Sequence, residues 1–465
     1  MTGETPQINT TDYKVDGSVN RVQIENLPLN GRNFLGLSAL EPGVSVTSFA
    51  NPGALGNNFV RVSVAGAIFN QTRISVDGGT VNERITGGTG QNFSRRGGND
   101  LHGTGFFYYR DHNMAAFPGF GRSASNPDPF FARRQSGFSL GGPFKKDRFF
   151  WFTNYEHNNQ DGVFDVRNNN PIFSRFDRIH PSPLNFNLFN LRLDGQLTQK
   201  HNGYLRFSLD KNSSFAPPAA ATFMPSNWQS SRNRWTQTQI GLTSALTPKL
   251  VNDLRVSYLF LKSYLTPPTQ EECPDPVACI GLGGPQIAIF DAALFRIGNQ
   301  NAVPTSRFPR TFQLTDNLTW QRGEHRLRFG GEWEHLYFRA SLTSVEPAAI
   351  TLWGVSNLQG QALRPIFDSL PASLRGASNS PPTLDEILQL PLRNFTTGIG
   401  NPVLPGPYNF DEASRNDRVR LYFQDAWRIH PRFTFNYGLA YSIETNLLNH
   451  DLDRPAYLAP APGER

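Results

Sequence analysis

Two cysteines are the first residues in this chain whose types and spacing could support chemistry. Cys273 and Cys279 are separated by five residues in the segment EECPDPVACIG. Either the two thiols are unrelated or they form a local disulfide that closes a small loop. We favour the disulfide, which implies an oxidising compartment. A zinc site is not expected, because it needs four ligands and no histidine lies nearby.

Charged residues at alternate positions between 326 and 334 form a second candidate group. On an extended chain they would share one face, where they could line a path for a solute. We favour the other interpretation, in which these residues form a ladder of charges on the inner face of a β-sheet. There they would form hydrogen bonds and ion pairs with neighbouring strands and with a domain packed against that face. The ladder consists of Arg326, Arg328, Glu332 and Glu334.

The glycine-rich sequence segments do not have the pattern of an enzyme's phosphate site. Neither the segment 87–98 nor the pair Gly141 and Gly142 is followed by the GK[ST] of a phosphate loop, and the sequence contains no HExxH. We therefore expect no catalytic residue, no metal and no cofactor, and predict that the protein is not an enzyme. A β-rich hydrolase is the weakest hypothesis, because no pair of carboxylates stands out.

The composition favours β structure over a soluble helical enzyme. Aromatic residues make up 12% of the 465 residues, whereas charged residues make up only 18%. No run of about 18 apolar residues exists, which excludes a membrane-spanning helix but not a membrane barrel, whose strands are apolar at every second position. The net charge of +6 is scattered, so we expect no nucleic-acid partner.

The amino terminus, MTGETPQINTTDYKVDG, lacks the basic start and apolar stretch of a secretory signal. This leaves two interpretations. Either the protein stays in the cytoplasm, or its true start is missing.

Strict alternation of apolar and polar residues recurs from about residue 101 onward. In the segment 189–210, Leu205, Phe207 and Leu209 share one face, and Arg206 and Ser208 lie on the other. Similar hairpins are predicted at 134–157, 234–263, 310–339 and 416–445.

Short turns between these strands alternate with long connections, so all long connections would lie at one end of the strands. Outer-membrane barrels have this asymmetry, and the predicted strands of about ten residues can cross a bilayer. A β-sandwich is the alternative, but its strands are usually shorter. The long connections are predicted at 111–133, 158–188, 211–233, 264–309 and 340–415.

We therefore predict a mainly β protein, an antiparallel up-and-down transmembrane β-barrel with about 11 strands. Residues 101–465 would form this partial barrel with long extracellular loops. Residues 1–100 would form a small α+β domain. Within the long segment 340–415, Thr383 and Glu386 predict a capping box at the start of a helical turn.

The ordered motifs resemble those of Oar-like TonB-dependent receptors. The segment IENLPLNGRNFLGLSALEPGV, Ile24 to Val44, is similar to the opening of the plug domain in that family, and ISVDGGTVNE, Ile74 to Glu83, resembles a later turn of the plug. The resemblance continues through GGNDLHGTGFFYYRD and FSLGGPFKKDRFFWFTNYEH into the first barrel strands. The plug motif residues are Leu27, Pro28, Leu29, Asn30, Gly31, Arg32, Asn33, Asp77 and Gly78.

For Asn30, Gly31, Arg32 and Asn33, two interpretations stay open. They could contact the barrel wall or TonB, or they could be a polar turn before a short helix. For Asp77 and Gly78 we favour a β-turn with no chemical role.

The resemblance implies an outer-membrane barrel blocked by a plug, with 22 strands when complete, so that eleven strands are roughly half. It also implies four partners: outer-membrane lipid, the TonB complex, the barrel assembly machinery and a small solute. The solute could be a siderophore, cobalamin or an oligosaccharide. We predict a receptor fragment that is not competent for transport alone. The alternative is a surface or adhesive β protein that binds through its long loops.

Overall fold

The computed structural model describes most of the chain. The described residues are 34–47, 61–67, 71–82, 89, 96–114, 128–168, 170–217, 223–290, 295–342, 348–398 and 412–445.

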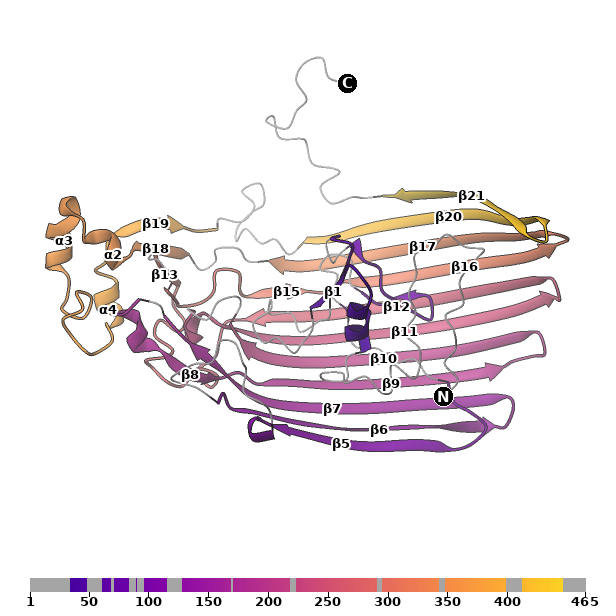
Figure 1. Cartoon of the computed structure of the whole chain (residues 1–465), viewed down its shortest axis with the longest axis horizontal. Coiled ribbons are helices and arrows are strands. Elements are labelled where there is room, and N and C mark those ends of the chain that lie inside the picture. Colours follow the sequence, from indigo (N-terminus) through magenta and orange to yellow (C-terminus); the bar gives the residue numbers. More distant parts are fainter. Residues whose placement is uncertain are drawn as a thin grey trace, which may run out of the picture.

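One antiparallel sheet of thirteen strands dominates these residues (Figure 1). Two of its strands are short, β8 (Arg178–Pro181) beside β7 and β15 (Thr305–Arg307) beside β12 and β17. The other eleven confirm the predicted strand count. They are β5 (His102–Asp111), β6 (Phe131–Lys145), β7 (Phe149–Val166), β9 (Leu184–Gln196), β10 (His201–Ala216), β11 (Gln229–Thr247), β12 (Leu250–Thr266), β16 (Arg310–Arg322), β17 (His325–Leu342), β20 (Glu412–His430) and β21 (Phe433–Glu444).

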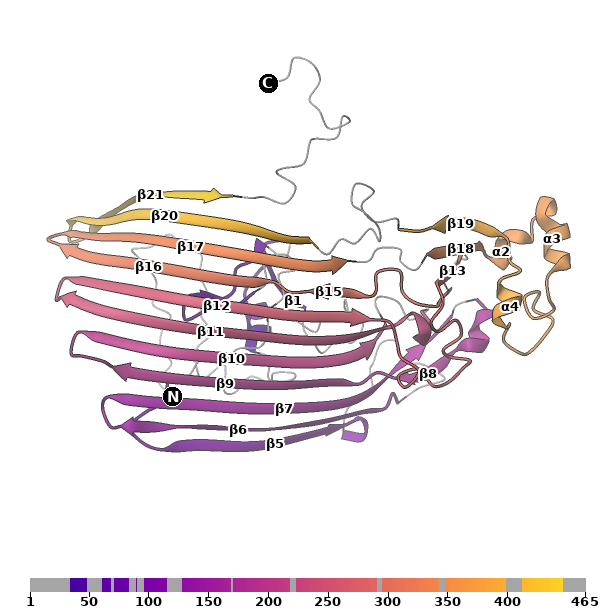
Figure 2. The same ribbon diagram turned by 180° about the vertical axis from the view of Figure 1, so that it is seen from behind.

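These long strands pair in the order in which they occur along the chain, which is the up-and-down topology predicted. Strands β5 and β21 lie at the two edges, and each has one neighbour among the described strands (Figure 2). The sheet is therefore a curved wall that does not close into a barrel.

In this wall the polar side chains are buried and the apolar side chains are exposed, which is the reverse of a soluble protein. On β10, Leu205 is exposed, whereas Arg206, on the concave face, is fully buried. On β11, Ile240 is 54% exposed, whereas Gln237 and Gln239 are fully buried. Apolar side chains facing outward and polar side chains facing inward are the pattern of a wall that stands in lipid.

The strands extend further toward the long connections than the alternation predicts. Strand β7 continues to Val166 and β12 to Thr266, so the predicted connections beginning at 158 and 264 start later. The sequence pattern changes there because both faces are polar or covered once a strand passes the apolar band. The ladder hydrogen bonds nevertheless continue, as in the pairing of Gln160 with Leu184.

A compact lobe lies at the long-connection end of the wall (Figure 1). Its sheet consists of β13 (Gln286–Phe290), β14 (Phe295–Ile297), β18 (Ala349–Trp353) and β19 (Leu392–Thr396). Its helices are α2 (Val355–Leu358), α3 (Arg364–Ser369), α4 (Leu384–Ile387) and the 3-10 helix η7 (Gln361–Leu363). The predicted capping box of Thr383 and Glu386 is present at the start of α4.

Buried apolar side chains from the lobe and from nearby connections form the largest apolar core. Trp228, Phe295, Ile289 and Leu374 are among its fully buried members. The 3-10 helix η5 (Phe173–Phe176) supplies Phe173 and Phe176 to this core. The 3-10 helix η6 (Pro225–Asn227) lies between two core members, Met224 and Trp228. A further 3-10 helix, η4 (His112–Met114), follows β5.

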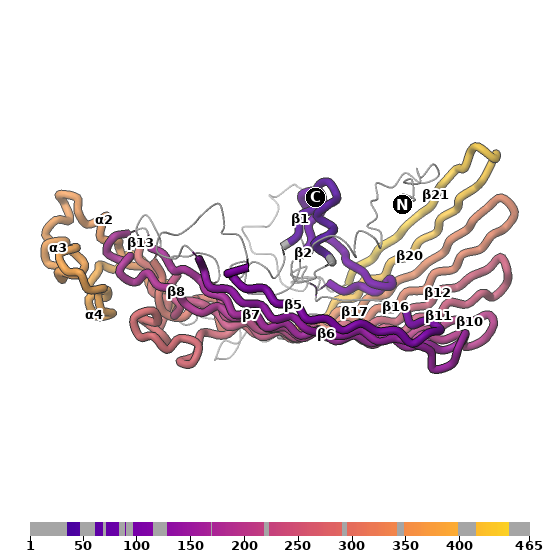
Figure 3. Tube along the Cα trace, turned by 60° about the horizontal axis from the view of Figure 1, so that its bottom comes forward, coloured from indigo at the N-terminus to yellow at the C-terminus, as the bar shows by residue number. Residues whose placement is uncertain are grey.

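The described N-terminal elements lie on the concave side of the wall (Figure 3). They are the 3-10 helix η2 (Phe34–Leu40) and the paired strands β1 (Val44–Thr47) with β2 (Arg61–Val64) and β3 (Ser75–Val76) with β4 (Gly79–Thr80). Across the residues described, none of the helices has the length and apolar character needed to cross a membrane.

Candidate functional site

Many polar contacts lie where the hairpin of β3 and β4 meets the concave face of the wall. Asp77 and Gly78 connect the two strands, and both have positive φ, 51° and 82°. A two-residue turn with positive φ at both positions is the hairpin turn that Asp-Gly favours. A Cβ on Gly78 would lie 1.8 Å from Arg255 Nη1, so the turn and the end of the Arg255 side chain are close together.

The carboxylate of Asp77 pairs with two arginines of the wall. Arg192 Nη1 on β9 donates to Asp77 Oδ2 at 2.7 Å, and Arg206 Nη1 on β10 lies 3.4 Å from the same oxygen. Arg192 also donates to both carboxylate oxygens of Asp194, at 2.9 to 3.1 Å, which fixes the plane of its guanidinium group. The turn therefore provides a carboxylate for cations that the wall buries.

Backbone groups of the hairpin and of Val81, which follows it, form hydrogen bonds with side chains of the wall. Gln237 Nε2 donates to the Thr80 carbonyl at 2.8 Å, and Gln313 Oε1 accepts from the Thr80 amide at 2.9 Å. Trp235 Nε1 donates to the Val81 carbonyl at 3.2 Å. Because buried backbone groups need partners, these side chains determine where the hairpin can lie.

A second ion-paired contact involves the predicted charge ladder. Glu332 on β17 accepts from Arg73 at 2.6 and 3.1 Å, and from Arg420 Nη1 on β20 at 2.7 Å. Glu334 is also buried on the concave face. Arg326 is exposed and Arg328 half-buried, and both lie near the short turn that begins β17. The structure thus brings Glu332 of the ladder to Arg73 of the N-terminal segment.

The plug motif divides between described and undescribed residues. Leu27 through Asn33 lie outside the described residues, and a 3-10 helix begins immediately afterwards, at Phe34. Asp77 and Gly78 form the predicted turn. The sequence alone does not single out the wall residues that receive this turn, although Arg192 and Arg206 are polar residues at inward positions of alternating strands.

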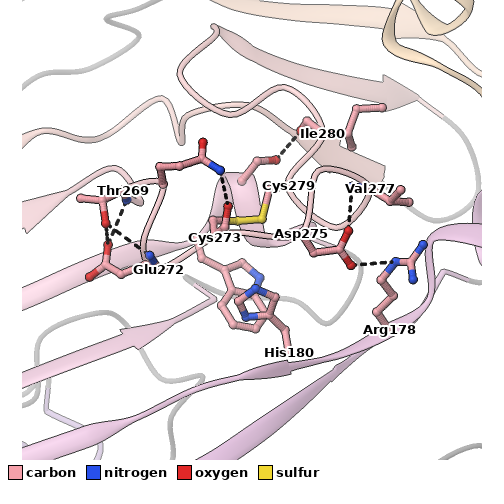
Figure 4. The surroundings of a disulfide bond; sticks show 12 residues. Arg178, His180, Thr269, Glu272, Cys273, Asp275, Val277, Cys279 and Ile280 are labelled. Atoms are coloured by element: carbon pink, nitrogen blue, oxygen red, sulfur yellow. Dashed lines mark hydrogen bonds and ion pairs between the residues drawn. A yellow bond between two sulfur atoms is a disulfide. The ribbon is translucent and has the colours of Figure 1, made fainter.

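Cys273 and Cys279 are joined by a disulfide in the connection between β12 and β13 (Figure 4). The expectation that no histidine lies nearby is wrong in three dimensions, because β8 brings His180 to the disulfide. A ligand atom of His180 and the two sulfurs lie within 4.8 Å of one another. The bonded sulfurs are not thiolates and do not form a metal site with the imidazole.

A cavity of about 500 Å³ lies beside this disulfide. Its lining includes His180, Arg232, Glu271, Glu272 and Asp275, so it is rich in groups that carry or can gain charge. Burial lowers the pKa of His180, and its Nδ1 lies 3.1 Å from the Pro181 carbonyl. The imidazole ring packs against Trp228, with ring centroids 5.2 Å apart.

The sequence matches the family model described as an outer membrane beta barrel domain over residues 93–171 and 163–461. The chain belongs to this outer-membrane β-barrel family. The protein is accordingly a component of the outer membrane. The match includes every long strand of the wall.

Solved structures with a similar fold include the outer membrane transporter YddB from Escherichia coli, which is 12% identical with a TM-score of 0.54. A variant of the ferric enterobactin receptor PfeA from Pseudomonas aeruginosa is 13% identical, also with a TM-score of 0.54. Each alignment covers 91% of this chain and 56% of the other, so the chain spans about half the length of these proteins. Comparison with curated proteins gives no match. The chain has a TonB-dependent receptor-like fold over about half of such a barrel, as the sequence motifs indicated.

Proposed function

We propose that this chain is the plug-bearing part of an outer-membrane receptor that takes up a scarce solute when its plug is displaced. In this proposal residues 1–100 form the plug and residues 101–465 form part of the barrel wall. The observation that carries it is the docking of the Asp77 hairpin on the buried polar face of the wall. A segment held there lies where the lumen of a complete barrel would be.

The contacts that hold the hairpin suit a reversible interaction. They are mainly ion pairs and hydrogen bonds, supplemented by one small apolar cluster of Val81 with Trp235, Leu259 and Leu261. Polar groups that separate can be rehydrated, so the net cost of opening such an interface is far below the sum of its gross interactions. Displacement would therefore need a modest input of energy, and we assign its delivery to the TonB complex.

A ferric siderophore is the solute class that we propose. The likeness to the ferric enterobactin receptor supports this choice, and the charged cavity near His180 offers polar groups at the long-connection end. The proposal also includes insertion of the complete protein by the barrel assembly machinery.

Cross-linking the hairpin to the wall tests the proposal. A Cβ placed on Gly79 would lie 3.2 Å from Ser257 Oγ, so the pair Gly79→Cys with Ser257→Cys can form a disulfide if the Gln239 side chain moves aside. In the full-length receptor we expect oxidation of this pair to abolish uptake of ferric enterobactin, the probe used, and reduction to restore it. Each single cysteine variant serves as the control and should transport in both conditions.

The surface or adhesive protein is the second candidate, favoured by the compact lobe with its own apolar core. Adhesion through the lobe would not need the hairpin to move. Undiminished uptake in the cross-linked receptor would contradict plug displacement, whereas cell-surface binding without any uptake would favour adhesion.

A further inference from the structure

The outward face of strands β10, β11 and β12 changes from uncharged to positively charged side chains toward the long connections. Leu209 on β10 lies opposite Thr236 on β11, which lies opposite Phe260 on β12. Two residues further toward the long connections, the same face carries Lys211, opposite Arg234, opposite Lys262. Three cations thus stand side by side at the border of the apolar band.

Three neighbouring positive charges repel one another, so this arrangement is unfavourable unless an anion neutralises them. Like charges directly opposite one another destabilise a strand pair. Among the residues that the structure describes, Lys211, Arg234 and Lys262 have no carboxylate partner. Lys262 Nζ lies 5.0 Å from the centroid of the Tyr264 ring, which gives it an aromatic contact but no counter-charge.

Further cations extend the row, whereas two basic residues on the outward faces of other strands are paired with carboxylates. Arg232 lies two residues beyond Arg234, and Arg310 on β16 lies opposite Phe260. By contrast, Arg134 on β6 pairs with Asp161 at 2.8 Å, and His335 on β17 bonds to Asp417 at 2.8 Å. At this border of the apolar band, the cations without a carboxylate partner among the described residues therefore lie on β10, β11, β12 and the start of β16.

The position of the row determines what can approach it. The apolar band below it stands in hydrocarbon, and the long connections beyond it lie outside the cell, because long loops of these barrels are external. Residues at the border are level with the headgroups of the outer leaflet. Adjacent strands are about 4.8 Å apart, so the three cations span roughly 10 Å, a width that suits phosphate groups on one headgroup.

We propose that Lys211, Arg234 and Lys262 form a binding site for the phosphorylated headgroup of an outer-leaflet lipid. The lipid phosphates supply the counter-charge that the protein lacks, and its acyl chains lie along Leu209, Phe207 and Leu205. This site is on the opposite face of the wall from the docked hairpin and does not depend on solute uptake.

The test measures lipid binding by the full 465-residue chain in neutral detergent micelles. The probes are radiolabelled lipid A with its phosphates and the same lipid after enzymatic dephosphorylation. Each basic residue near an anionic lipid surface contributes about a fivefold factor in affinity. We therefore expect Lys211→Gln, Arg234→Gln and Lys262→Gln together to weaken binding of phosphorylated lipid A roughly a hundredfold. Dephosphorylation should weaken binding to the unaltered chain similarly.

The matched control removes the same charge at the other rim, with Lys146→Gln, Lys200→Gln and Lys249→Gln in exposed short turns. It should bind phosphorylated lipid A as the unaltered chain does. Equal binding of the two lipids by the unaltered chain would overturn the proposal, whether or not the variants fold. Equal loss in both triple variants, or full displacement of the lipid by excess inorganic phosphate, would overturn it as well.

Discussion

At the scale of single residues, the charge of Asp77 is coupled to the burial of Arg206. The Arg206 side chain has no exposed surface, and the Asp77 side chain is 28% exposed. A guanidinium group so placed remains charged at neutral pH and requires a nearby anion. The turn is thus an electrostatic partner of the wall as well as a connection between two strands.

Asp77→Ala should therefore destabilise the folded chain. Removing one partner of a buried ion pair costs about 3 to 5 kcal/mol, and partial exposure of Asp77 reduces this to about 2 kcal/mol. Guanidinium unfolding in micelles, followed by tryptophan fluorescence, measures the change. Asp161→Ala is the control, because its pair with Arg134 is nearly half exposed, and it should cost less than about 1 kcal/mol. Equal effects of the two variants would contradict the role given to Asp77.

His180 makes the stability of the lobe region depend on pH. Burial lowers its pKa in the folded chain, so below the unfolded pKa of about 6.5 the unfolded chain binds the proton more readily. Stability should consequently fall as the pH is lowered from about 7 to about 5. His180→Phe should reduce this dependence, as thermal unfolding at a series of pH values would show. His430→Gln, at the exposed end of β20, is the control variant.

At the scale of elements, the disulfide stabilises the connection between β12 and β13. The cysteines are six positions apart, and closing so short a loop contributes roughly 2 kcal/mol in the chain-entropy model. Adding a reductant should lower the unfolding midpoint of the chain by a corresponding amount. The double variant Cys273→Ser with Cys279→Ser should show no response to reductant. A reductant effect that persists in this variant would mean that it arises elsewhere.

Strand prediction succeeded where one face of the wall meets lipid. In β10, Leu205, Phe207 and Leu209 alternate with Arg206 and Ser208, and this period of two identifies a strand with two different faces. Beyond the apolar band the alternation ends, although β7 and β12 continue. Pairing with a neighbour, which the sequence of one strand does not contain, determines where each strand stops.

At the scale of the whole molecule, the two edges of the wall distinguish it from a closed barrel. Unpaired backbone groups in hydrocarbon cost several kcal/mol each, so the edges of β5 and β21 favour pairing with further strands. If further strands of a longer wall paired with β5 and β21, they would supply hydrogen-bond partners for these backbone groups.

Hydrogen exchange in micelles should reveal the edges. Amides of β5 and β21 that point away from the sheet should exchange at least about tenfold faster than those of β10 and β11, which have neighbours on both sides. The central strands serve as the internal control. Uniform protection across all strands would mean that the edges are already paired, for instance between two copies of the chain.

The sequence by itself determined the existence and order of the eleven long strands and the side of each that faces lipid, because a period of two and the length of connections are local properties. Only the tertiary structure decided which distant residues meet. Arg192 lies 115 positions from Asp77, and Glu332 lies 259 positions from Arg73. His180 likewise reaches the disulfide through folding alone. Such contacts depend on strand register and sheet curvature, which many weak interactions determine together.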